Sequence, residues 1–151
     1  MEEINNNIDP DKIHLDYIEK VWVSLDEYEN LMKTTSSITT YVAHTGGYNL
    51  EESKYLFGLH IVFSNSEISE KLECEFRYNF HYTIDNLQEM YDLNEDGIPI
   101  FKKIFVATLA GISYSTLRGI IFEKTSKSNV GVLTIPVINP STILDSWIKK
   151  E

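Results

Sequence analysis

The most restrictive feature of this chain is a stretch, residues 72–84, in which apolar and polar side chains alternate without interruption. Its apolar members are Leu72, Cys74, Phe76, Tyr78, Phe80, Tyr82 and Ile84. Because successive side chains of a β-strand point to opposite faces, this alternation predicts one long strand with a dry face and a wet face. Such a strand is typical of an antiparallel sheet that is covered on one side only.

Three segments before it also have the composition of strands. Residues 54–65 share one apolar face, which consists of Tyr55, Phe57, Leu59, Ile61 and Phe63. Residues 36–45 are rich in β-branched and aromatic side chains, which predicts a shorter strand that ends at the Gly46-Gly47 turn. Residues 12–26 alternate as well, but Glu19 interrupts the register, so we expect a bulged or bent strand there. Together the segments predict an antiparallel meander.

The second half of the chain has a helical pattern. A long helix is predicted from Ile98-Pro99 to about Lys124, with proline in the first turn, where its missing N–H does no harm. Apolar side chains continue almost all the way round this helix, so it must be buried on more than one side. Gly111 and Gly119 lower its helix propensity, which favours a role for both in close packing.

An extended apolar run, residues 130–138, follows the long helix and leads into a last, short helix. That helix begins at Asn139-Pro140, where a capping residue is followed by proline at the first helical position. Strands followed by helices predict an α+β fold. Its parts are a four-stranded antiparallel sheet, a long helix, an extended crossover segment and a short C-terminal helix.

A chain of 151 residues is the size of one domain. We expect a flexible N-terminal arm over residues 1–11, which are polar and acidic, and a single domain over residues 12–151. The longest run without charged or strongly polar residues lies around Ile104 to Ile112 and is far shorter than the ~20 residues of a membrane span. Because the N-terminus also lacks the pattern of a secretory signal, we expect a cytoplasmic protein without membrane insertion.

Composition and motifs argue against several classes of function. Thirteen Lys and Arg residues against twenty-three Asp and Glu residues give a net charge of −10, which repels nucleic acid. Cys74 is the only cysteine, so there is no internal disulfide and no thiolate metal cluster. The four histidines lack the spacing of a zinc site, and no phosphate-binding loop occurs. We therefore expect no enzyme, no cofactor, no metal and no need for ATP.

One loop contains half of a calcium-binding motif. Asp92, Asn94 and Asp96 alternate before Gly97, as oxygen ligands do in the first half of an EF-hand loop. The twelfth position of that loop, normally a bidentate Glu, is Lys103 here. A small calcium- or ligand-binding module therefore stays as an alternative function only.

Three aromatic residues have no obvious place in the predicted core. Trp22 lies on the minor face of the first strand, Tyr41 on a short strand and Trp147 on the last helix. Exposed apolar side chains often mark a binding surface. At this point a binding groove and an oligomer interface explain these residues equally well.

Two segments of the second half resemble a known family. They are Ile112-Ser-Tyr-Ser-Thr-Leu-Arg118-Gly119 in the long helix and Leu133-Thr-Ile-Pro-Val-Ile-Asn-Pro140 before the last helix. With the order of elements, they resemble the SecB family of protein-export chaperones. The resemblance implies a SecB-like, ATP-independent holdase that binds unfolded or non-native polypeptides. The client is a preprotein for export or, alternatively, another protein such as an antitoxin.

The resemblance also implies partners. SecB proteins are dimers of dimers, in which long helices are sandwiched between sheets, and they bind the export ATPase SecA through acidic residues on the outer sheet face. In this chain Glu73 and Glu75 resemble the acidic residues. For the homo-oligomer interface we expect residues of the long helix, because its apolar surface exceeds what one small sheet can cover. They are Phe105, Leu109, Ile112 and Leu117.

We also expect a client-binding groove bordered by the crossover segment, the last helix and the sheet. An extended segment beside a short amphipathic helix can shift without unfolding the sheet, which suits a site that accepts many sequences. The predicted groove residues are Trp22, Tyr41, Leu133, Ile135, Val137, Ile138, Leu144 and Trp147.

Overall fold

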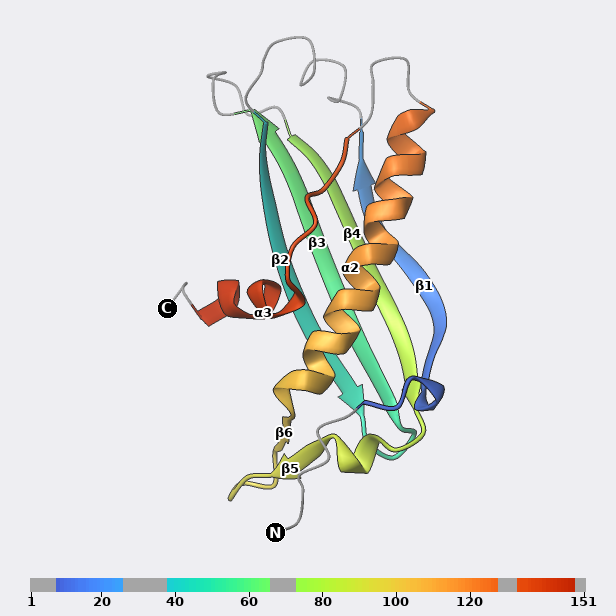
Figure 1. Cartoon of the computed structure of the whole chain (residues 1–151), viewed down its shortest axis with the longest axis vertical. Coiled ribbons are helices and arrows are strands. Elements are labelled where there is room, and N and C mark those ends of the chain that lie inside the picture. Colours follow the sequence, from blue (N-terminus) through green and yellow to red (C-terminus); the bar gives the residue numbers. More distant parts are fainter. Residues whose placement is uncertain (1–7, 26–37, 66–72, 128–132, 149–151) are drawn as a thin grey trace.

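The fold is a four-stranded antiparallel sheet with a long helix across one of its faces (Figure 1). We describe a computed structural model of the chain, over residues 8–25, 38–65, 73–127 and 133–148. The strands of the sheet are β1 (Ile13–Ser24), β2 (Ile38–Asn49), β3 (Lys54–Asn65) and β4 (Glu73–Ile84). Two helices follow, α2 (Lys103–Ser126) and α3 (Pro140–Ile148). The predicted α+β architecture is confirmed.

The sheet differs from the predicted meander in its strand order and in the position of one turn. Its order is β1-β4-β3-β2, so the first strand pairs with the fourth and not with the second. The predicted turn at Gly46-Gly47 is wrong, because β2 continues through both glycines and pairs with β3 as far as Asn49. The chain turns at residues 50–53 instead, where Ser53 has a left-handed φ of 56°.

The predicted irregularity of β1 takes the form of two bulges. The pairing with β4 shifts by one residue around Asp16 and again around Val21. A bulge sets two residues of one strand opposite a single residue of its neighbour, and so changes the face on which the following side chains lie.

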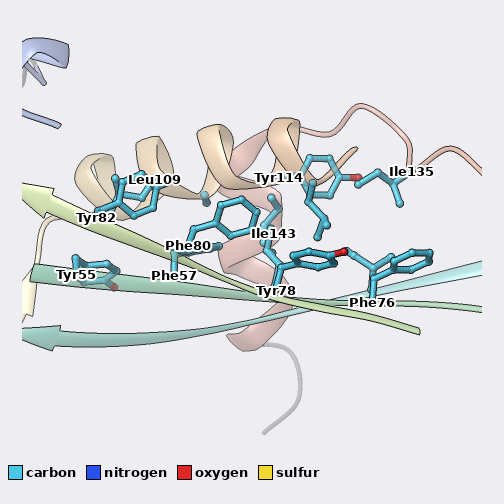
Figure 2. Close-up of a cluster of buried hydrophobic side chains, with 14 of the residues drawn as sticks. Tyr55, Phe57, Phe76, Tyr78, Phe80, Tyr82, Leu109, Tyr114, Ile135 and Ile143 are labelled. Carbon is cyan, nitrogen blue, oxygen red and sulfur yellow. The ribbon is translucent and has the colours of Figure 1, made fainter. Parts of the chain in front are cut away.

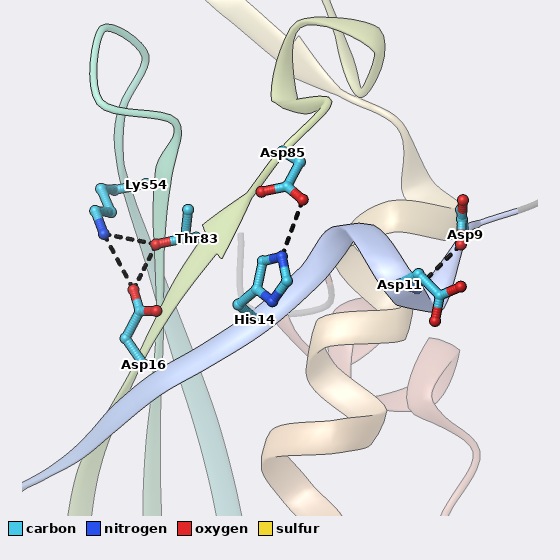
Figure 3. A network of polar contacts seen from close by, with 7 residues as sticks. All are labelled: Asp9, Asp11, His14, Asp16, Lys54, Thr83 and Asp85. Atoms are coloured by element: carbon cyan, nitrogen blue, oxygen red, sulfur yellow. Dashed lines mark hydrogen bonds and ion pairs between the residues drawn. The ribbon is translucent and has the colours of Figure 1, made fainter.

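The first bulge places two consecutive side chains on the same face. Asp16 bonds to Thr83 at 2.5 Å and to Lys54 at 3.1 Å (Figure 3). Its neighbour Tyr17 stacks on the ring of His81, with centroids 4.0 Å apart. Thr83 and His81 both lie on the face of β4 opposite to the core, so both bulge residues face outward.

The core lies between this sheet and α2. The dry face of β4 is confirmed, since Cys74, Phe76, Tyr78, Phe80, Tyr82 and Ile84 are all buried. From α2 the fully buried apolar residues are Phe105, Leu109, Ala110, Leu117 and Ile121. Figure 2 shows Leu109 among the buried side chains between α2 and the sheet. By length and composition alone α2 could cross a membrane. Its packing on the sheet makes it the core helix of the domain.

The long helix begins later than expected. Pro99–Phe101 form strand β6, which pairs with β5 (Tyr91–Leu93), and α2 starts only at Lys103. Close packing is confirmed for Gly111, where an added Cβ would lie 3.1 Å from Cγ of Pro140 in α3. It is wrong for Gly119, which has no such neighbour within 4 Å.

The chain enters the sheet through a short 3-10 turn, η1 (Pro10–Lys12). The carboxylate of Asp9 accepts the N–H of Asp11 at 3.0 Å, and the carbonyl oxygen of Lys12 accepts the N–H of Asp85 at 2.9 Å. The end of the expected N-terminal arm is therefore tied to the sheet, while residues 1–7 lie outside the described part of the chain.

Candidate functional site

The crossover segment, residues 133–139, is held to α2 through its main chain. Extended backbone normally bonds to another strand, but here side chains of α2 replace that strand. The bonds are Tyr114 hydroxyl to Pro136 carbonyl oxygen at 2.5 Å, Arg118 Nε to Ile135 carbonyl oxygen at 3.0 Å, and Leu133 N–H to Thr125 Oγ1 at 3.0 Å. Burial raises the pKa of the Tyr114 hydroxyl, so this group stays protonated and donates at neutral pH.

The side chains of the crossover segment do not all line a groove. Leu133 and Ile135 are buried in the core, and Figure 2 shows Ile135 beside Tyr114. Val137, by contrast, is 76% exposed. Ile138 and Leu144 are half-buried at the edge of the core. For Trp147 only the backbone, within α3, belongs to the described structure.

Trp22 and Tyr41 lie on the opposite side of the sheet from the crossover segment. Tyr41 pairs with Val62 and Trp22 pairs with Arg77, and both partners are on the face that α2 does not cover. We call this the outer face. The expected single groove is therefore split into two surfaces, one at the crossover segment and one on the outer face.

The outer face carries an exposed aromatic side chain on each of its edge strands, β1 and β2, and a hollow. Trp22 is 56% exposed and Tyr41 is 40% exposed. The hollow has a volume of about 270 Å³, and its lining includes Val21, Ala43, Thr45, Gly58, His60 and Arg77. Because the second bulge turns Val21 toward this hollow, counting alternate residues along β1 could not assign it there.

Two histidine–carboxylate pairs also lie on the outer face. His60 Nε2 is 2.6 Å from Glu75 Oε1, and Arg77 Nε donates to the same oxygen at 3.1 Å. His81 Nε2 is 3.0 Å from Glu19 Oε1. The hydrogen bond from His81, followed by that from Asn79, lowers the pKa of the Glu19 carboxyl.

The acidic residues expected to meet a partner are only partly placed. The carboxylate of Glu75 lies on the outer face but is already bonded to His60 and Arg77. The side chain of Glu73 lies outside the described part of the structure.

Most of the expected interface residues of α2 are core residues instead. Phe105, Leu109 and Leu117 are fully buried against the sheet of the same chain, so a second protomer cannot reach them. Ile112 faces away from the sheet and is 37% exposed. Phe122, which the sequence analysis did not select, lies on the same outward side of α2 and is 52% exposed.

The half motif for calcium belongs to the turn of the β5–β6 hairpin. The Oδ1 atom of Asn94 accepts the N–H groups of Asp96 and Ile98 at 3.0 and 2.9 Å, and Gly97 has a φ of 75°. These hydrogen bonds stabilise the turn and account for the polar side chain at position 94. Among the described residues, no group of three or more His, Cys, Asp or Glu side chains could hold a metal ion.

In sequence, the chain matches no protein-family model and no curated protein. In structure, it is similar to the Mycobacterium tuberculosis Rv1957 SecB-like chaperone, solved in complex with a ChAD peptide from the Rv1956 HigA1 antitoxin. The TM-score is 0.53 at 10% identity, over 85% of this chain and 92% of that chain.

A second solved structure, a Streptococcus agalactiae protein of unknown function, has a TM-score of only 0.30 at 11% identity, over 83% of this chain and 93% of that one. The order of strands and helices, together with the likeness to the M. tuberculosis chaperone, shows that this chain has a SecB-like fold.

Proposed function

We propose that the protein is an ATP-independent chaperone that binds unfolded segments of other polypeptides. The observation that carries this proposal is the amount of apolar surface left exposed on separate sides of a well-packed domain. Val137 is exposed at the crossover segment, and Trp22 and Tyr41 are exposed on the outer face. Exposed apolar patches of this kind are typical of surfaces that bind other proteins.

Several weak apolar sites suit a chaperone better than one deep pocket. Each site contributes little affinity, but a long unfolded chain can occupy several at once, which raises the overall affinity without new contacts. The net charge of −10 keeps such an apolar surface soluble. A calcium-binding module is a poorer explanation, because Asn94 already serves the hairpin turn.

The class of client has two candidates. The resemblance to export chaperones favours preproteins, with SecA as a further partner in the cytoplasm. The M. tuberculosis protein is described in complex with an antitoxin peptide, which favours an antitoxin as the client. Of these we favour a client other than a preprotein, because the carboxylate of Glu75 is already bonded within the outer face and is poorly placed to receive SecA.

The function is tested by the aggregation of chemically denatured citrate synthase after dilution into buffer. We expect stoichiometric amounts of the protein to suppress light scattering without ATP. No suppression at a several-fold excess would contradict the proposal.

Single charged substitutions at exposed positions test the two surfaces one at a time. Val137→Asp tests the crossover segment and Trp22→Asp tests the outer face, while Gln88→Asp, also exposed and remote from both, controls for the added charge. All three should melt near the temperature of the unaltered protein, because exposed sites tolerate substitution. At least one of the first two should weaken suppression; unchanged suppression by both would show that neither surface binds clients.

A further inference from the structure

The outer face has a second hollow, near the end of the sheet at which β2 turns into β3. Its volume is about 400 Å³, within the range of roughly 300–1,000 Å³ that is typical of small-molecule sites. Four residues that pair in one row across all four strands contribute to its lining. They are Tyr17, His81, Leu56 and Gly47. Every residue that lines this hollow belongs to the described part of the chain.

One wall of the second hollow is a pair of stacked rings. The rings of Tyr17 and His81 have centroids 4.0 Å apart and planes 10° apart, and Tyr17 is 56% exposed. The bulge around Asp16 sets the carboxylate of Asp16 beside this stack, on the same face of the sheet. Bulges are common next to active sites, where they redirect a side chain. The irregularity of β1 therefore supplies both a ring and a carboxylate to one wall.

The floor of the second hollow contains a glycine that the packing of the sheet does not require. At Gly58, elsewhere in the sheet, an added Cβ would lie 2.3 Å from Oγ1 of Thr45, which would have to move. At Gly47 the added Cβ would lie 3.7 Å from Cβ of Leu56, an ordinary van der Waals contact, and the backbone φ of Gly47 is not positive. Glycine weakens a strand and often marks a place where a ligand approaches closely. The open floor at Gly47 is therefore better explained by a ligand than by the fold.

The charges around the second hollow favour a cation. The charged residues that line it are Asp16, Glu52 and Lys54. The ammonium group of Lys54 donates to Oδ2 of Asp16 at 3.1 Å, so these two charges offset each other (Figure 3). The carboxylate of Glu52, an exposed residue, then leaves the lining with a net negative charge. The net charge of −10 on the whole chain adds to the attraction of a cation.

We propose that the second hollow binds a small organic cation with a flat apolar ring, such as an aromatic amidine. The ring would lie over Gly47 and Leu56, against the stack of Tyr17 and His81. The positive group would be attracted by the carboxylate of Glu52 and by the face of an aromatic ring. This site is separate from client binding, so the inference goes beyond the proposed chaperone function.

The probe is benzamidinium, which combines a flat ring with a delocalised positive charge. Benzamide has the same ring without the charge, and methylguanidinium has a similar charge without the ring. In an NMR titration of the ¹⁵N-labelled protein, benzamidinium at roughly millimolar concentration should saturate shifts of the amides of Tyr17, Gly47 and Leu56. Each control compound should bind more weakly by about threefold or more, since it lacks one of the two contributions.

A pair of valine variants tests the floor of the hollow. Gly47→Val fills the floor with a side chain that suits a strand, whereas Thr39→Val changes the same strand and face outside the hollow. Gly47→Val should weaken benzamidinium binding by about tenfold or more through steric exclusion, and Thr39→Val should leave it unchanged. Tyr17→Leu tests the wall independently of the floor and should weaken binding by about two- to fivefold.

A pair of glutamine variants tests the charge. Glu52→Gln should weaken the binding of benzamidinium but not that of benzamide, because only the former carries a charge. Glu95→Gln, which removes an exposed carboxylate in the β5–β6 turn, is the matched control and should change neither affinity.

The inference is supported by saturable shifts at the residues that line the second hollow, provided that Gly47→Val abolishes or strongly weakens them. It is overturned if benzamide or methylguanidinium binds as tightly as benzamidinium, if Gly47→Val binds with unaltered affinity, or if the shifts lie elsewhere on the protein. These titrations contain no client polypeptide, so neither result changes the standing of the chaperone function, which the aggregation of citrate synthase tests.

Discussion

A buried hydrogen bond connects the two layers of the core. The hydroxyl groups of Tyr82 on β4 and Ser113 on α2 are 2.6 Å apart, and both residues are buried. Burial raises the pKa of Tyr82, so this hydroxyl stays protonated in the folded protein. A polar pair at this place fixes how far α2 can slide along the sheet, which apolar contacts alone leave less defined.

Ser113→Ala should destabilise the protein by about 1–3 kcal/mol, because it leaves the buried hydroxyl of Tyr82 without a partner. Ser115→Ala, two residues along the same helix and exposed, should change stability by less than about 0.5 kcal/mol. Urea unfolding monitored by circular dichroism measures both. Equal effects of the two substitutions would contradict the role given to the bond.

The Asp16 carboxylate on the outer face should make stability depend on pH. The hydrogen bond from Thr83, together with the hydrogen bond and the positive charge of Lys54, lowers the pKa of Asp16 below its ordinary value of 3.8. A lowered carboxyl pKa stabilises the folded state above the unfolded value, and this contribution is lost as pH falls through the folded value. The melting temperature of Asp16→Asn should therefore lie below that of the unaltered protein at pH about 6, and the difference should shrink toward pH about 2.5. A difference that stays constant over this range would contradict the assignment.

At the scale of elements, the sequence was sufficient to predict strands and helices wherever their hydrophobic or capping pattern is regular. β3, the dry face of β4 and the start of α3 follow directly from alternation and capping, and the structure confirms them. The faces of β1 could not be read in this way, because each bulge changes the parity of the residues after it. The pairing of β1 with β4 could not be predicted from a local sequence pattern either, because the two strands are far apart in the chain.

The candidate site was harder to predict than the fold for the same reason. Leu133, Ile135 and Val137 alternate along the crossover segment, yet only the structure shows that the first two are core residues. Trp22 and Tyr41 were selected correctly as exposed aromatic residues, but sequence gives no information on which side of the sheet they lie.

The two helical glycines should respond differently to the same substitution. Gly119→Ala should stabilise the folded chain by up to about 1 kcal/mol, because alanine favours the helix and no described part of the same chain opposes its methyl group. Gly111→Ala should give no such gain, since the new Cβ would press on Pro140 at the start of α3. Thermal melting of the two variants provides the comparison. A larger increase in melting temperature at Gly111 than at Gly119 would show that α3 can move away from the new methyl group at little cost in free energy.

At the scale of the whole molecule, we propose assembly into a dimer of dimers through the outward side of α2. Ile112 and Phe122 lie on that side, and the apolar composition of α2 is far greater than one covered face requires. A helix that is apolar on both sides is expected between two layers, and the second layer would come from another copy of the chain.

Two substitutions to aspartate distinguish the two sides of α2. Ile112→Asp should leave the fold intact and shift light scattering of the eluted protein to a smaller species. Leu109→Asp places a charge in the core and should unfold the chain, with a cost of several kcal/mol. A folded, unaltered protein that is monomeric at micromolar concentration would contradict the assembly.

The order β1-β4-β3-β2 also determines when the sheet can close during synthesis. β2, β3 and β4 leave the ribosome one after another and can pair as soon as they emerge, whereas β1 emerges first and pairs last, since Ile13 awaits Ile84. At roughly 5–20 residues per second, translation leaves β1 without its partner for about 4–14 s. During that interval Ile18, Val21 and Trp22 have no sheet to join. The nascent chain of this proposed chaperone is therefore itself, for several seconds, an unfolded polypeptide with an apolar strand exposed to solvent.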